Sequence, residues 1–146
     1  SATCSATAAA SGCPTTFPAT GDPRPRHNRP TMPRRPENLY PQYHAHVYFG
    51  PATVAQARAL CEQAGRELMV VVARVHERLV GPHPHWSCQL AFDAAEFDTV
   101  IGWLDSHRDG LDVFVHGLTG NDLADHTDHA MWLGDESALD LRMFRH

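Results

Sequence analysis

The sequence predicts one α+β domain in which elements follow in the order strand, helix, strand, strand, helix, strand. Three observations support this prediction. Segments of alternating apolar and polar residues are separated by segments with apolar residues three and four positions apart. The 146 residues are enough for one substantial core and too few for two. Residues 1–38 are rich in Ala, Pro and Arg with few large apolar side chains, so we expect a disordered extension before a domain over 39–146.

The first strand and the first helix are predicted between residues 43 and 65. Residues 43–49, Tyr-His-Ala-His-Val-Tyr-Phe, are mostly aromatic or β-branched and are followed by Gly50-Pro51, which ends a strand. From Thr53 onward apolar residues recur at helical spacing, and Gly65 stands where a glycine commonly ends a helix.

Two further strands and the second helix follow. The Val-rich run 68–79 predicts the second strand, the Gly-Pro-His-Pro segment 81–84 breaks it, and residues 86–92 alternate as the third. Asp93 and Glu96 form a capping-box pattern before the apolar helical spacing of 97–104. Residues 111–116 alternate as the fourth strand.

This order is the split βαβ, ferredoxin-like arrangement. It implies a four-stranded antiparallel sheet with both helices on one face, and its other face is left for a ligand, a partner or later residues. Residues 130–133 are candidates for a short added strand.

Histidines are expected to converge on this second face of the sheet. If Ala45, Val47 and Phe49 pack under the helices, then His44 and His46 point away from them, because side chains alternate along a strand. The fourth strand borders the first in this topology, and the same alternation brings His116 to the same face. We therefore predict a metal site with ligands His44, His46 and His116.

Other polar residues could complete this site. His83 lies in the Pro-rich turn and is a candidate ligand or proton-transfer group, and His126 and His129 are further catalytic candidates. Possible carboxylate ligands are Asp122, Asp125 and Asp128. Imidazole and carboxylate suit Fe(II), Zn or Mn. The plainer interpretation is that His44 and His46 are ordinary polar residues of a strand and that 122–129 is a solvated loop.

Charge and composition exclude several classes of function. Residues 42–146 carry seven arginines and fifteen acidic residues, a net charge of −8, so this domain should repel nucleic acid. No run approaches the length of a membrane span. Cys61 and Cys88 occur singly in apolar patterns without a CxxC pair, which favours a reducing, cytoplasmic setting.

Three blocks of this sequence resemble the DOPA 4,5-dioxygenase family, and the resemblance extends from about Tyr43 to Gly134. The blocks are Tyr-His-Ala-His-Val-Tyr-Phe at 43–49, Gly-Pro-His-Pro-His-Trp at 81–86, and the segment 118–134 that contains Asn-Asp-Leu-Ala-Asp-His-Thr-Asp-His. Their order and spacing match those of the family.

The resemblance implies a ferredoxin-like homodimer that uses Fe(II) and O₂ to cleave the ring of L-DOPA or a related catechol at an extradiol position. Two other interpretations remain open. A cofactor-independent monooxygenase would use a pocket and a histidine without metal, and a non-catalytic module would bind a metal or ligand without consuming O₂.

Overall fold

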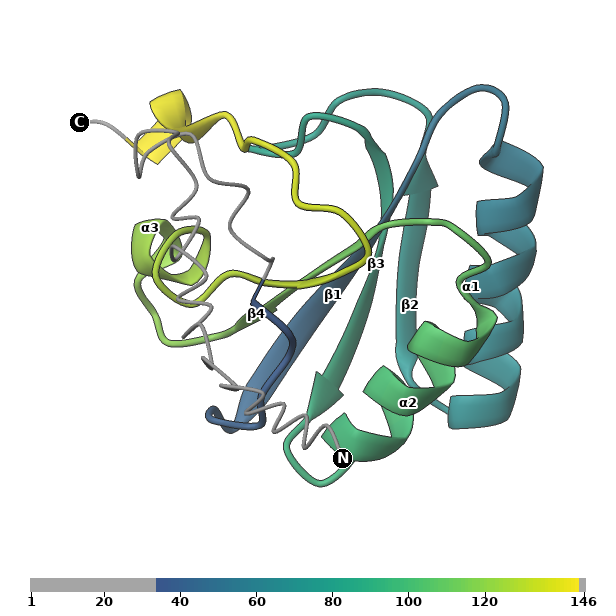
Figure 1. Cartoon of the computed structure of the whole chain (residues 1–146), viewed down its shortest axis with the longest axis horizontal. Helices are drawn as coiled ribbons and strands as arrows, with labels where there is room; N and C mark the ends of the chain where they lie inside the picture. Colours follow the sequence, from purple (N-terminus) through teal and green to yellow (C-terminus); the bar gives the residue numbers. More distant parts are fainter. Residues whose placement is uncertain (1–33, 145–146) are drawn as a thin grey trace, which may run out of the picture. The chain divides into compact units, whose positions relative to one another are not determined.

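The computed structural model describes residues 34–144, and these form an α+β domain with an open antiparallel sheet (Figure 1). Its elements in chain order are β1 (Gln42–Phe49), α1 (Val54–Leu68), β2 (Val71–His76), β3 (Trp86–Asp93), α2 (Phe97–His107), β4 (Val113–Gly117), α3 (Asp122–Asp125), β5 (Met131–Leu133) and the 3₁₀ helix η2 (Leu141–Phe144). The predicted disordered extension lies outside the described residues except for 34–38, and Arg34 and Asn38 hydrogen-bond to the domain.

The sheet contains the four predicted strands and a fifth. Its strand order is β2-β3-β1-β4-β5, and every neighbouring pair is antiparallel. The four-stranded sheet expected from the sequence is therefore extended at its β4 edge by β5. The register between β1 and β4 places His44 opposite His116 and His46 opposite Phe114.

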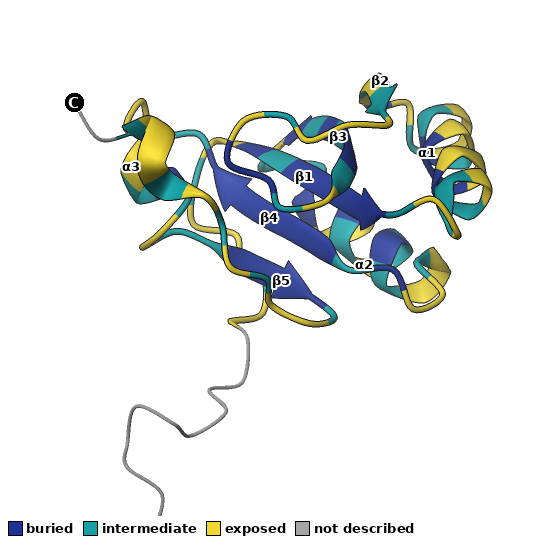
Figure 2. Cartoon of the chain, turned by 90° about the horizontal axis from the view of Figure 1, so that it is seen from above, coloured by how far each residue is buried: buried dark blue, intermediate teal, exposed yellow. Residues whose placement is uncertain are grey.

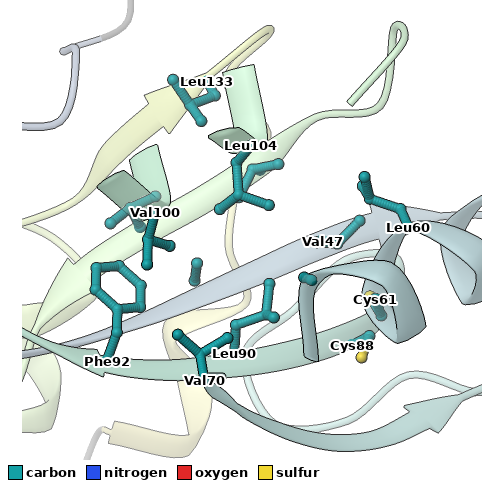
Figure 3. Packing of buried hydrophobic residues seen from close by; sticks show 14 of the residues in the cluster. Val47, Leu60, Cys61, Val70, Cys88, Leu90, Phe92, Val100, Leu104 and Leu133 are labelled. Carbon is teal, nitrogen blue, oxygen red and sulfur yellow. The ribbon is translucent and has the colours of Figure 1, made fainter. Parts of the chain in front are cut away.

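One face of the sheet packs against α1 and α2 and contains the main hydrophobic core (Figures 2 and 3). Ala45, Val47 and Phe49 of β1 lie in this core, as the alternation of the strand predicted. Val113 and Val115 of β4 join them. Because side chains alternate along a strand, the remaining side chains of β1 and β4 point to the opposite face of the sheet.

The end of α1 differs from the prediction that Gly65 terminates it. The helix continues to Leu68 and ends at Met69, which has the left-handed backbone conformation (φ 57°). Gly65 instead lies where the helix approaches β2, because a Cβ atom on it would come within 3.2 Å of a methyl carbon of Val72. A close contact between elements, rather than a helix end, accounts for this glycine.

The start of α2 follows the predicted capping box. The backbone N–H of Glu96 donates to the Asp93 carboxylate at 3.0 Å, and the backbone N–H of Asp93 donates to the Glu96 carboxylate at 3.2 Å. These two bonds lie in the turn before the first helical residue, Phe97, and they fix that turn between β3 and α2.

The second face of the sheet is partly covered by residues that follow β4, which is one of the possibilities expected from the sequence, and α3 adds a short helix to the two that were expected. α3 and the segment that ends in η2 lie on this side (Figure 1), and His126 at the end of α3 contacts the ring of Phe114. β2 is an edge strand whose Val71 is 70% exposed. Within residues 34–144, no helix has the length and apolarity needed to cross a membrane.

Candidate metal centre

Three histidines meet on the second face of the sheet, near its middle. His44 and His46 come from β1 and His116 from β4, and one ring nitrogen of each lies within 4.8 Å of the others. The Nε2 atoms of His46 and His116 are 3.2 Å apart. The strand alternation and the β1–β4 neighbour relation that were expected from the sequence, together with the observed register, create this cluster.

The donor atoms of His46 and His116 fit a small divalent metal ion. Two imidazole nitrogens bound about 2.1 Å from one ion lie roughly 3 to 3.5 Å apart, and the His46–His116 separation falls in that range. The Nδ1 of His116 donates to the carbonyl of Gly117 at 3.0 Å, so its Nε2 keeps the lone pair that a metal needs. His44 lies 3.4 Å from the side-chain amide of Gln89, which would have to turn if His44 bound through Nε2.

Burial keeps these imidazoles neutral. It is the main cause that lowers the pKa of His116 to about 4 and the pKa of His46 well below its ordinary value. The neighbouring histidines lower the pKa of His46 further by charge repulsion. The pKa of the half-buried His44 is also lowered, again mainly by burial. Neutral imidazole is the form that binds metal, so the cluster is ready to bind at neutral pH.

His83 lies beside the three histidines, as the sequence suggested. Its ring centroid is 4.1 Å from that of His46, and burial lowers its pKa to about 4. Its Nδ1 is 2.7 Å from the hydroxyl of Tyr48. Burial also raises the pKa of that hydroxyl. His83 is outside the group of three whose nitrogens could share one ion.

The other two candidate histidines lie in different places. The ring of His126 is 4.5 Å from that of His116, and its Nδ1 donates to the carbonyl of Asp122 at 2.7 Å, which leaves Nε2 as an acceptor. His129 instead pairs with the hydroxyl of Tyr40 at 2.6 Å. In residues 34–144 no ring contact joins His129 to the other histidines of the site.

None of the three aspartates proposed as ligands belongs to the described group whose donor atoms could share one ion. Asp122 and Asp128 are exposed. Asp125 is buried, but its two carboxylate oxygens accept hydrogen bonds from the backbone N–H and the hydroxyl of Thr119. Among the described residues, the potential metal-binding group contains histidines and no carboxylate.

Aromatic residues surround the histidines on this face. Tyr48, Phe114 and Trp132 form a buried aromatic cluster next to the histidines. The strand alternation that brings His46 and His116 to this face brings Tyr48 and Phe114 there too, whereas Trp132 of β5 was not identified from the sequence. Nothing local in the sequence indicated that the segment 135–144 would return over this face, where Leu139 packs on the aromatic cluster.

A hollow of about 370 Å³ adjoins the half-buried side of the cluster. His44, Ala91 and Glu96 are among its lining residues, so it borders the beginning of β1 and the end of β3. Its volume is within the range of small-molecule sites. Of the three clustered histidines, His44 lines this hollow.

Comparisons with known proteins point to one family. The family model described as the Dopa 4,5-dioxygenase family matches residues 43–143. A DOPA 4,5-dioxygenase of Amanita muscaria is 30% identical over 109 residues, which are 68% of this chain and 48% of the fungal protein. An uncharacterized 21.2 kDa protein of Botryotinia fuckeliana is 30% identical over 115 residues, 70% of this chain and 63% of that protein. The chain thus spans about half to under two thirds of these relatives.

A solved structure agrees with the sequence matches. A protein of Nostoc punctiforme, described with its crystal structure as a candidate dioxygenase, superposes with a TM-score of 0.70 and 38% identity. The match covers 73% of this chain and 92% of the Nostoc chain. The likeness therefore includes nearly the whole of that solved domain.

Proposed function

Because the chain belongs to the Dopa 4,5-dioxygenase family, we propose that it is a metal-dependent extradiol dioxygenase that opens the ring of a catechol with O₂. The observation that carries the proposal is the convergence of His44, His46 and His116. L-DOPA or a related catechol is the proposed substrate, since the named Amanita relative is a DOPA 4,5-dioxygenase. The strand order of β1 to β4 supports a ferredoxin-like core, to which β5 is added.

The reaction needs no reductant. The ring bond next to the two hydroxyl-bearing carbons breaks, and both atoms of O₂ enter the product as an aldehyde oxygen and a carboxylate oxygen. A bound Fe(II) ion would supply charge transfer between catechol and O₂ and orient both. Fe(II) is proposed over Zn because the reaction requires a redox-active ion.

The protein residues have separate tasks in this proposal. His44, His46 and His116 hold the ion, and the hollow beside His44 admits the catechol ring. The catechol must lose a proton to bind. The Nδ1 of His126 bonds to the carbonyl of Asp122, and its Nε2, in the ring next to His116, is the proposed acceptor, while the ring of His83 lies near those of His46 and His126.

The test is to load the purified protein anaerobically with Fe(II), Mn(II) or Zn(II) and then add air with L-DOPA, caffeate or protocatechuate. We expect O₂ uptake and a yellow ring-fission product with Fe(II), and none with Zn(II). His107→Ala, which removes an exposed histidine of α2, should behave as the parent.

Two outcomes would favour other functions. Turnover of a phenol by thoroughly metal-free protein would indicate a cofactor-independent monooxygenase. Stoichiometric metal binding without O₂ uptake for any catechol would indicate a non-catalytic binding module.

The proposal includes assembly and cellular setting. We propose a homodimer that forms over the uncovered part of the sheet near β2, where Val71 is 70% exposed. Sedimentation should give a dimer that Val71→Asp dissociates, and a monomeric parent protein would refute this. The free thiols of Cys61 and Cys88, both buried, support a reducing cytoplasmic setting.

A further inference from the structure

The pair formed by Tyr48 and His83 decides which ring nitrogen of His83 carries the proton. The Tyr48 hydroxyl lies 2.7 Å from Nδ1 of His83, and both side chains are buried, 3% and 7% exposed. Tyr48 comes from β1, whereas His83 comes from the loop between β2 and β3. The contact therefore joins a rigid strand to the loop that brings His83 to the histidine cluster.

The direction of this hydrogen bond follows from the available partners. A phenol keeps its proton at neutral pH and must place it on an acceptor when it is buried. Among the described residues, Nδ1 of His83 is the partner recorded for the Tyr48 hydroxyl. If His83 donated from Nδ1 instead, the buried O–H of Tyr48 would have no acceptor there. The O–H of Tyr48 therefore donates, and Nδ1 of neutral His83 accepts.

We propose that Tyr48 is a positioning residue that holds His83 as the tautomer with its proton on Nε2. The inference rests on the proposed dioxygenase function for its catalytic meaning and on the Tyr48–His83 contact for its structure. An Nε2 that carries a proton has no lone pair for a metal. His83 is then a hydrogen-bond donor beside the metal centre and not a fourth ligand.

The packing around Tyr48 supports this role. Its ring lies against Phe114 and Trp132, with centroids at 6.4 and 5.9 Å, and these three residues form one buried cluster. The ring is held by this packing while its hydroxyl reaches His83. Removing the hydroxyl alone should leave the ring in place and free the tautomer of His83.

A matched control exists in the same domain. The Tyr40 hydroxyl makes the same kind of contact with Nδ1 of His129, at 2.6 Å, away from the histidine cluster. Tyr40→Phe removes one tyrosine–histidine hydrogen bond just as Tyr48→Phe does. It does so at a histidine that has no part in the proposed reaction.

The first experiment is nitrogen NMR of histidine-labelled protein loaded with Zn(II), with the His83 signals assigned by their loss in His83→Gln. We expect the pattern of an Nε2–H tautomer in the parent protein and a shift toward the Nδ1–H tautomer in Tyr48→Phe. Tyr40→Phe should leave the His83 signals unchanged. An Nδ1–H tautomer in the parent, or no change in Tyr48→Phe, would overturn the inference.

The second experiment tests whether His83 is a hydrogen-bond donor or a metal ligand. His83→Gln should keep its Zn(II) dissociation constant within threefold of the parent, whereas a ligand substitution raises it by orders of magnitude. With Fe(II) and a catechol, Tyr48→Phe should lower kcat about tenfold with KM within twofold, and Tyr40→Phe should change neither. A loss of Zn(II) affinity in His83→Gln would make it a ligand and refute the inference.

The dioxygenase activity and the role of Tyr48 can be refuted separately. If no catechol is consumed but the NMR pattern is as expected, the dioxygenase proposal fails and the placement of the proton stands. If the catechol is cleaved but His83 carries its proton on Nδ1, the dioxygenase proposal stands and the role of Tyr48 is refuted.

Discussion

His46 illustrates how one side chain serves both the sheet and the proposed metal centre. It is 5% exposed, its ring stacks near Phe114, and its Nε2 lies 3.2 Å from that of His116. A buried polar group is tolerated only when it has a partner. The partner of His46 is His116, which is another potential metal ligand. The buried polar groups on this face of the sheet therefore pair with each other within the proposed metal site.

The first prediction is that His46→Ala loses metal and keeps its fold. Removing one of three ligands should weaken Zn(II) binding by more than about 100-fold. Emptying the buried position should lower the free energy of unfolding of the metal-free protein by about 1 to 3 kcal/mol. Calorimetric Zn(II) titration and urea unfolding measure the two effects. Unchanged affinity would show that His46 is a structural histidine.

Asp125 is predicted to support the chain rather than bind the ion. Its two carboxylate oxygens are bonded to Thr119, so Asp125→Ala should lower the free energy of unfolding by about 2 to 4 kcal/mol. The Zn(II) dissociation constant should change less than tenfold. Asp122→Ala, at an exposed position, is the control and should change neither quantity. A hundredfold loss of Zn(II) affinity in Asp125→Ala would make it a ligand.

At the level of elements, two glycines differ in what surrounds them. Gly110 precedes β4 and Gly134 follows β5, and both have positive φ, 84° and 87°. A Cβ on Gly110 would meet nothing within 4 Å, whereas a Cβ on Gly134 would clash with the side chain of Asp112. Alanine is disfavoured at both positions because the backbone φ is positive. Of these two glycines, only Gly134 would also bring a Cβ atom into contact with another side chain.

The resulting prediction compares Gly110→Ala with Gly134→Ala. We expect the first to lower the free energy of unfolding by about 1 kcal/mol, from backbone strain alone. The second should lower it by about 1 to 3 kcal/mol more, because Asp112 must move. Urea unfolding of both variants measures the difference. Equal losses would show that the contact with Asp112 relaxes without penalty.

The elements that could be predicted from the sequence are those governed by alternation or helical spacing. The phase of β1 selected His44 and His46, and the expected neighbour relation added His116. Gly65 was wrongly assigned as a helix end. It is needed for the close approach of α1 to Val72 in β2, and a local capping pattern does not reveal such a contact between elements. The side chains of the aspartates in 122–128 could not be placed from the sequence. Asp125 bonds to Thr119, which lies in a loop, where neither strand alternation nor helical spacing predicts the direction of a side chain.

At the scale of the whole molecule, the buried neutral histidines make stability depend on pH. The folded protein keeps His83 and His116 neutral down to a pKa of about 4, while an unfolded chain protonates them near 6.5. The unfolded state therefore binds more protons between these values. Stability is fully present above pH 6.5 and is lost as the pH falls toward 4.

We predict that the metal-free protein loses up to about 3 kcal/mol of unfolding free energy for each of these histidines between pH 6.5 and 4. Urea unfolding at several pH values, with chelator present, measures this slope. The variant His83→Gln should show a smaller slope because one titrating group is missing. A stability that is constant over this range would contradict the burial of neutral imidazole.

The two different faces of β1 limit which insertions and deletions the strand can tolerate. Ala45 and Val47 face the core while His44 and His46 face the metal centre. Any single substitution touches one face, but adding or deleting one residue in β1 would exchange the two sets, since side chains alternate. In a library of variants, β1 should accept substitutions at several positions and reject every one-residue length change, with stability and metal binding lost together.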